Sequence, residues 1–182
     1  MNKNHLIKSK DVELLASIAT GLRADYGQRD IAWKDSPFAW IKTRPSRQIG
    51  KIGEDLVAGW CAAKRLNVSR SSNSDADKII EGLRVEIKLS TLWEGGFYKF
   101  QQVRNQEYDV LLCLGVSPFD AHAWVMKKSD IPFDRLEHQH GGARGSDTWW
   151  IQVDPQRIPQ WLKKHSGRLS SLKSFFKENG KK

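Results

Sequence analysis

The chain has 182 residues, of which 39% are hydrophobic, and its 30 Lys and Arg against 21 Asp and Glu leave a formal net charge of +9. The apolar fraction excludes an intrinsically disordered chain, and the length suits one substantial hydrophobic core, so we expect a single domain. The positive charge favours a polyanionic partner such as nucleic acid. The basic side chains gathered in residues 163–182 are also compatible with a solvated tail.

The sequence shows no secretory signal and no membrane span. Residues 1–15, MNKNHLIKSKDVELL, contain no continuous apolar run, and no later stretch approaches the about 20 apolar residues that a spanning helix needs. We therefore expect a cytoplasmic protein with no membrane partner. Cys61 and Cys113 fall in apolar contexts, which favours buried free thiols over a disulfide.

Apolar periodicity predicts two helices in the first part of the chain. Residues 11–26 place leucines and an isoleucine at helical spacing, and Gly27 marks the end of this helix. Residues 28–46 contain prolines and tryptophans in an irregular stretch that we expect to be a loop. Residues 47–66 should form a helix that lies on a sheet. Its apolar stripe consists of Ile49, Ile52, Leu56, Trp60 and Ala63.

Short apolar segments predict strands in the rest of the chain. The run 108–116 is nearly uninterrupted, as is typical of a central strand covered on both faces. Two helices are expected, one at 99–106 and one at 155–163 with Asp154 as its cap. The expected strands are 77–80, 83–90, 108–116, 121–126 and 148–153. This order predicts an α/β fold, with a mixed sheet flanked by helices.

The predicted hairpin places acidic and basic side chains on one face of a strand. Residues 83–90, LRVEIKLS, alternate apolar and polar side chains, so Glu86 and Lys88 point to the same face. If residues 81–82 form a two-residue turn, the antiparallel register pairs Asp77 with Glu86. Two carboxylates then lie opposite each other.

Opposed carboxylates of this kind favour a metal site. Their Cβ atoms lie about 4.5–5.5 Å apart, and like charges at that distance destabilise a hairpin unless a cation lies between them. Mg²⁺ suits such a site, because it binds through one or two carboxylates and keeps water in the rest of its shell. We expect Asp77 and Glu86 to bind Mg²⁺ beside Lys88, whereas Lys78 falls on the apolar face. The spacing alone is also compatible with a solvated hairpin.

The segment 47–127 resembles the core of the PD-(D/E)xK nucleases, the restriction-endonuclease-like superfamily. The resemblance rests on the helix with Glu54, on Asp77, on the strand VEIK with Glu86 and Lys88, and on the apolar strand that begins YDVLL. It implies a restriction-endonuclease-like core of αβββαβ type and metal-dependent phosphodiester hydrolysis. Asp77 and Glu86 match the acidic ligands of the superfamily and Lys88 matches its lysine.

Two details of this resemblance leave alternatives. Ala76 stands where the superfamily usually has proline, and Asp75 is an alternative ligand, although the hairpin register favours Asp77. Glu54 lies at the border of the apolar stripe of its helix, where the superfamily often has a supporting glutamate. An ordinary surface position fits Glu54 as well.

Polar side chains that follow the hairpin are candidates for DNA contacts. They can reach phosphates or base edges, or they can form the polar face of a helix, and by the resemblance Gln101 or Gln102 lies nearest the active face. The loop EHQHGGARGSD contains His138 and His140, which have no partners at zinc-finger spacing and receive no catalytic role. The candidate DNA-binding residues are Lys99, Gln102, Arg104, Asn105, Gln106 and Arg144.

Among families with this core, the chain most resembles a small type II restriction endonuclease. That implies a Mg²⁺-dependent endonuclease that cuts double-stranded DNA as a homodimer. On this view residues 1–46 form an N-terminal helical arm and loop, 47–127 the catalytic core, and 128–182 a basic C-terminal extension. A DNA repair or junction-resolving nuclease needs the same hairpin. A DNA-binding module without catalysis needs only the basic surface, and the intact Asp, Glu and Lys set argues against it.

Overall fold

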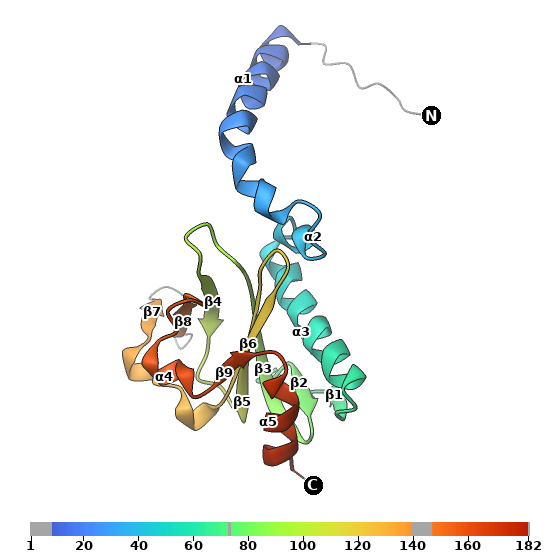
Figure 1. The fold of residues 1–182 in the computed structure, drawn as a ribbon, viewed down its shortest axis with the longest axis vertical. Coiled ribbons are helices and arrows are strands. Elements are labelled where there is room, and N and C mark those ends of the chain that lie inside the picture. The colour runs from blue at the N-terminus through green and yellow to red at the C-terminus, as the bar shows by residue number, and fades with distance from the viewer. Residues whose placement is uncertain (1–8, 73, 140–146, 182) are drawn as a thin grey trace. The chain divides into compact units, whose positions relative to one another are not determined.

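The computed structural model describes residues 9–72, 74–139 and 147–181, and for residues 23–30 it describes the backbone alone (Figure 1). The chain forms two compact units, Met1–Asp35 and Ser36–Lys182. No helix in the described ranges is long and apolar enough to cross a membrane.

The first unit consists of the helix α1 (Lys10–Gly27) and the short 3₁₀ helix η1 (Gln28–Trp33). The helix predicted at 11–26 is therefore confirmed. Several aliphatic side chains of α1 are exposed, so the helix presents an apolar surface to its surroundings. They are Val12, Leu14, Leu15, Ile18 and Leu22.

The second unit is built on a six-stranded mixed sheet with the strand order β1-β2-β3-β5-β6-β9. Strands β3 and β5 run parallel, and the other neighbouring strands run antiparallel. The strands are β1 (Val68–Arg70), β2 (Lys78–Ile80), β3 (Leu83–Thr91), β5 (Val110–Val116), β6 (Ala121–Lys127) and β9 (Ser166–Arg168). The predicted mixed sheet is confirmed, with the apolar run at 108–116 as an inner strand.

A smaller sheet and several helices complete this unit. The sheet has the order β4-β8-β7, with β4 (Tyr98–Val103), β7 (Glu137–Gln139) and β8 (Thr148–Val153). The helices are α2 (Ala39–Lys42), α3 (Ser46–Ala63), η2 (Lys128–Asp130), η3 (Phe133–Arg135), α4 (Gln160–Lys163) and α5 (Ser171–Asn179).

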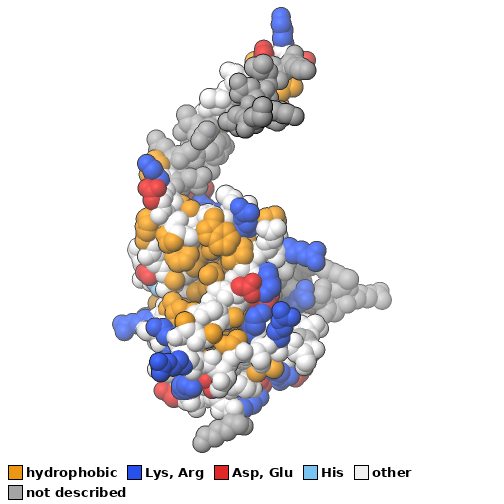
Figure 2. Space-filling model, turned by 90° about the vertical axis from the view of Figure 1, so that its right-hand side faces the viewer, with side chains coloured by type: hydrophobic (Ala, Val, Ile, Leu, Met, Phe, Trp, Pro, Cys, Tyr) orange, Lys and Arg blue, Asp and Glu red, His pale blue; other side chains and the backbone are white. Residues whose placement is uncertain are grey.

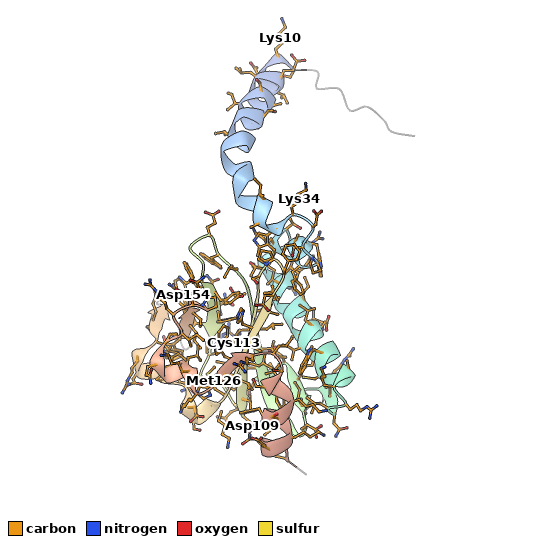
Figure 3. The ribbon with its side chains drawn as sticks, viewed as in Figure 1. Lys10, Lys34, Asp109, Cys113, Met126 and Asp154 are labelled. Carbon is orange, nitrogen blue, oxygen red and sulfur yellow. The ribbon has the colours of Figure 1, made fainter. Side chains whose placement is uncertain are left out.

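Two apolar cores cover the two faces of the main sheet. One lies against α3 and α5 and contains Val57 and Phe176. The other lies against the smaller sheet and contains Cys113 and Met126, which Figure 3 places in the interior of this unit. In Figure 1, α3 and α5 lie on one side of the main sheet, and β4, β7 and β8 lie on the other. Cys61 and Cys113 are buried free thiols, as the sequence predicted.

The helix predicted at 47–66 is α3, but the centre of its buried face differs from the predicted stripe. Gly53, Val57 and Cys61 are buried. Of the predicted stripe, Ile49, Ile52, Leu56 and Trp60 lie at the borders of this face and are only partly buried, and Ala63 is exposed. Gly53 permits the close packing, because a Cβ at that position would lie 2.7 Å from the Cβ of Leu89 on β3. Figure 2 shows apolar side chains gathered on the side of the molecule where α3 lies.

The prediction of a helix at 99–106 is wrong, because residues 98–103 form strand β4. Tyr98 and Phe100 are fully buried in the second core, while Lys99 between them points away from it. The period of two ends at Gln102, whose φ is +55°. There β4 contains one residue more than its partner, since Phe100 pairs with Ile151 and Val103 pairs with Trp149. This bulge hides the alternation on which a strand prediction depends.

The C-terminal helix predicted at 155–163 is also wrong in its extent. Asp154 closes a turn, accepting a hydrogen bond at Oδ1 from the Gln156 N–H at 2.8 Å, and α4 begins only at Gln160 after Pro159. Residues beyond α4, expected as a basic extension, add β9 to the main sheet and α5 to its first core. The signal that could have revealed α5 is its apolar spacing, with Leu172 and Phe176 four residues apart on one helical face.

The C-terminal residues also contact the hairpin. The Lys181 N–H donates to the Glu81 carbonyl at 2.9 Å, and the Lys181 ammonium donates to Asp109 Oδ2 at 3.0 Å. Asp109, labelled in Figure 3, also accepts hydrogen bonds from the backbone N–H and the guanidinium of Arg84. These bonds connect Lys181, just after α5, to the β2–β3 turn and, through Asp109 and Arg84, to β3.

Candidate functional site

A tight turn sets the register of the β2–β3 hairpin. Glu81 and Gly82 have φ values of +48° and +76°, as a two-residue hairpin turn of the type I′ kind requires. Ile80 pairs with Leu83, and Lys78 pairs with Val85. The predicted turn and register are confirmed up to this point, and the ladder ends one residue before Asp77 would pair with Glu86.

Asp77 is fixed to β3 by its backbone and its side chain. Its N–H donates to the Val85 carbonyl at 3.0 Å, and its Oδ2 accepts a hydrogen bond from the Ile87 N–H at 2.7 Å. These two partners flank Glu86 along the strand. The Asp77 carboxylate therefore occupies the edge of β3 at the point where β2 stops covering it.

The environment of Asp77 concentrates negative charge. The pKa of its carboxyl is raised to about 6, mainly by burial and also by the charges of Glu86 and Glu54, against opposing effects from the Ile87 N–H and from Lys88. A carboxyl group held at such a pKa by burial and by neighbouring carboxylates is characteristic of sites that bind cations or transfer protons.

Glu86 and Lys88 point to the same face of the sheet, as predicted. Their partners on β5 are Leu111 and Cys113, which belong to the core beside the smaller sheet. Glu86 is only 6% exposed, and its Oε1 lies 2.6 Å from the Lys88 ammonium. The lysine partly neutralises a carboxylate that would otherwise be buried without a counter-charge.

Glu54 lies on the other side of the hairpin, on α3. Its Oε2 accepts a hydrogen bond from the Lys78 ammonium at 2.7 Å, and Lys51 lies 3.5 Å from the same oxygen. Lys78, which the sequence placed on the apolar face, is 9% exposed and is satisfied there by Glu54. Because Glu54 also contributes to the raised pKa of Asp77, it belongs to the electrostatic surroundings of the site.

An open pocket of about 540 Å³ runs along the uncovered edge of β3, between α3 and β4. Glu54, Asp77 and Lys88 line it, whereas Glu86 and Asp75 are absent from the described residues in its wall. Basic groups from three elements reach the pocket, namely Arg47 of α3, Lys88 of β3 and Lys99 of β4. An open, positively charged pocket next to two carboxylates suits a phosphate-containing ligand.

The structure divides the predicted DNA-binding residues into two groups. Lys99, Gln102 and also Gln101 line the pocket. The second group lies beyond the end of β4 and does not appear among the described residues of the pocket wall; it consists of Arg104, Asn105 and Gln106. Sequence reasoning missed Arg47, which lies in the first turn of α3, because nothing local to it indicates that α3 borders the hairpin edge.

The histidine-containing loop is only partly described. Arg144 and His140 lie outside the described residues. His138 lies on β7, with its Nε2 3.3 Å from Asp147 Oδ1 and its ring 5.3 Å from that of Trp149. His138 is thus held on the smaller sheet, and it does not line the pocket described above.

The donor set at Asp77 and Glu86 fits a hard divalent cation bound mainly by water and substrate. In the described part of the chain, no group of three or more His, Cys, Asp or Glu side chains forms a ready ligand shell. Two neighbouring carboxylates are, however, what Mg²⁺ uses when phosphates and water supply its other ligands. Burial is the main cause of the raised pKa of Asp77, and the charge of Glu86 is the next.

Comparisons with known proteins give little further information. No protein-family model matches the chain, and no curated protein matches it. One solved structure, that of the bacterial homing endonuclease I-Ssp6803I, can be superposed on 74% of this chain and 97% of that chain, with 16% identity and a TM-score of 0.48. At that identity and score, the likeness carries no conclusion about the activity of this chain.

Proposed function

We propose that the protein is a Mg²⁺-dependent endodeoxyribonuclease of the PD-(D/E)xK type, with Asp77, Glu86 and Lys88 at its reaction centre. The proposal is carried by the convergence of two carboxylates and an ammonium at the uncovered end of one hairpin, beside an open basic pocket. Neighbouring carboxylates that are partly removed from water weaken a fold. Their presence together therefore favours a site that acts through them.

Each residue has a role that follows from its position. Asp77 and Glu86 would hold the cation from the edge and from the face of β3, and Glu54 would support them from α3. When bound, the cation supplies a Lewis acid for the phosphoryl group and acidifies an attacking water. Lys88 places its ammonium beside Glu86, where it can orient that water and offset the negative charge that develops on the phosphate.

DNA is the substrate that best fits the surroundings of these residues. The net charge of the protein is +9, and Arg47, Lys88 and Lys99 all line the pocket. Amide groups of Gln101 and Gln102 line the same pocket and can donate to and accept from base edges or phosphates. This combination supports a DNA-cutting enzyme, for which we propose the type II restriction class and a cytoplasmic location.

A homodimer would let such an enzyme cut both strands of a duplex. The exposed apolar residues of α1 support this arrangement, because a solvent-exposed apolar helix face is stabilised by pairing with a second copy. Sedimentation velocity of the wild type and of a Leu15→Asp, Ile18→Asp variant tests the point. We expect a dimer that the double substitution dissociates, and a wild type that stays monomeric at micromolar concentration would contradict it.

Incubation of the pure protein with plasmid and unmethylated phage DNA, with and without Mg²⁺, tests the activity itself. We expect discrete fragments with Mg²⁺ and intact DNA without it, and Ca²⁺ should support binding but not cleavage, because its longer, looser coordination does not enforce the reactive geometry. Asp77→Ala and Glu86→Ala should each abolish cleavage while DNA binding persists. Asp75→Ala is the matched control and should cut normally.

The same assay separates the competing functions. Binding without cleavage under every metal condition would indicate a non-catalytic DNA-binding module. Cleavage confined to mismatched or branched DNA would indicate a repair or junction-resolving nuclease. Unchanged cleavage by both Asp77→Ala and Glu86→Ala would overturn the assignment of the site.

A further inference from the structure

Trp93 lies on the wall of the pocket, yet the proposed hydrolysis gives it no role. All eight tryptophans of the protein lie within the described residues, and two of them are exposed, Trp40 at 48% and Trp93 at 46%. Of these two, Trp93 lines the pocket together with Asp77 and Lys88. A large indole left half exposed beside charged groups favours a ligand with an aromatic face.

The loop that carries Trp93 holds the indole in a fixed position. This loop joins β3 to β4 (Figure 1). The backbone N–H of Trp93 donates to the Phe97 carbonyl, and the backbone N–H of Gly96 donates to the Trp93 carbonyl, both at 2.9 Å. Gly96 has a φ of +77°, which glycine adopts without strain. The ring of Phe97 stacks on that of Trp93, with centroids 5.8 Å apart and an interplanar angle of 29°.

A positive charge accompanies this aromatic surface. The Lys99 ammonium lies 5.9 Å from the centre of the Trp93 ring and 3.3 Å from that of Trp150. The backbone N–H of Lys99 is bound to Ser90 Oγ at 3.0 Å, which fixes the start of β4 against β3. An aromatic ring with a lysine beside it is the combination by which proteins hold an unpaired nucleotide, through its base and its phosphate.

We infer that Trp93 stacks on an unpaired base of DNA while Lys99 contacts a neighbouring phosphate. The inference rests on the proposed function, because it takes DNA as the ligand of this pocket. In an intact duplex each base is covered by its neighbours, so Trp93 can stack only on a base at a bulge, in a single strand, or drawn out of the helix. The bound DNA therefore has an unpaired nucleotide at the Trp93 ring, and in a duplex substrate this nucleotide must be drawn out of the helix.

Fluorescence of 2-aminopurine tests the stacking without any cleavage. An oligonucleotide with 2-aminopurine in a single-base bulge is titrated with protein in EDTA, in parallel with the same base in a fully paired duplex. We expect quenching and tighter binding for the bulged DNA. Trp93→Ala should weaken bulge binding by about tenfold to a hundredfold, the range for loss of one base–aromatic stack, and Trp93→Phe should keep most of it.

Trp40→Ala is the matched control, because Trp40 is equally exposed but does not line the pocket. It should bind both DNAs as the wild type does. Equal binding of bulged and paired DNA by the wild type, or the same affinity for Trp93→Ala and Trp40→Ala, would overturn the inference. Trp93-dependent quenching by a protein that never cuts DNA would support the base site and refute the nuclease activity. Cleavage by a protein whose DNA binding and quenching are unchanged by Trp93→Ala would refute the base site and support the nuclease.

Discussion

Replacing Asp77 with Asn should stabilise the metal-free protein near neutral pH. The pKa of Asp77 is raised from 3.8 to about 6, mainly by burial and then by the charge of Glu86. The difference is roughly two pKa units, and at about 1.4 kcal/mol per unit the ionised carboxylate costs up to about 3 kcal/mol at pH 7. Because Asp77 is partly exposed, solvent screens this cost, and we expect a gain of about 1–1.5 kcal/mol.

The sign of the shift determines the pH dependence of this gain. With the higher pKa in the folded state, the folded protein binds the proton more tightly, so stability falls as pH rises from about 4 to about 6. Thermal unfolding followed by circular dichroism in EDTA should place Asp77→Asn about 2–6 °C above the wild type at pH 7.5. The two proteins should converge below about pH 4.

A control and a refuting outcome complete this test. Asp75→Asn removes a carboxylate two residues away and should give no pH-dependent gain. Mg²⁺ should raise the unfolding temperature of the wild type but not that of Asp77→Asn, because the substitution removes a ligand. An Asp77→Asn variant that is no more stable than the wild type at pH 7.5 would refute the electrostatic reasoning.

Three further substitutions test other parts of the structure. Lys88→Ala should slow single-turnover cleavage by about 10²- to 10³-fold with little change of DNA affinity in Ca²⁺, and a mainly weakened affinity would contradict a chemical role. Burial alone would raise the pKa of Asp109, but its hydrogen bonds lower it to about 2. Asp109→Asn should therefore cost about 1 kcal/mol in urea unfolding at pH 7, a loss that should vanish as pH falls from about 4 to about 2, and a pH-independent loss would argue against ion pairing. Gly53→Ala should destabilise the protein by about 1 kcal/mol in the same assay, because its Cβ would lie 2.7 Å from Leu89. Gly59→Ala, whose Cβ would have nothing within 4 Å, should stabilise the helix instead. A change of unfolding free energy in the same direction for both variants would contradict the close packing at Gly53.

Local patterns were sufficient to predict the parts of the fold that depend on local chemistry. The turn at Glu81-Gly82 fixes the hairpin register within a few residues, so Asp77, Glu86 and Lys88 could be placed near one another from the sequence. The inner strand β5 could also be predicted from the sequence, because a continuous apolar run indicates a strand covered on both faces without knowledge of its neighbouring strands.

The parts that sequence reasoning missed depend on contacts between distant segments. The ion pair of Glu54 with Lys78 forms only when α3 packs on the hairpin, and a pattern within either segment does not indicate it. Strand β4 was mistaken for a helix because its bulge at Gln102 breaks the alternation. With that error, Arg104 was assigned to the same surface as Lys99, whereas only Lys99 reaches the pocket.

The bulge in β4 separates the chemistry of the pocket from the packing of the core. Phe100 and Val103 both remain buried, and the extra residue leaves Gln101 and Gln102 exposed side by side, where a regular strand would turn one of them inward. Loss of one of the two glutamines by deletion would restore a regular ladder with both apolar anchors in place. We therefore expect the strand to tolerate a change of length at this point, so that the two amide side chains lining the pocket could be exchanged while the hydrophobic interior stays the same.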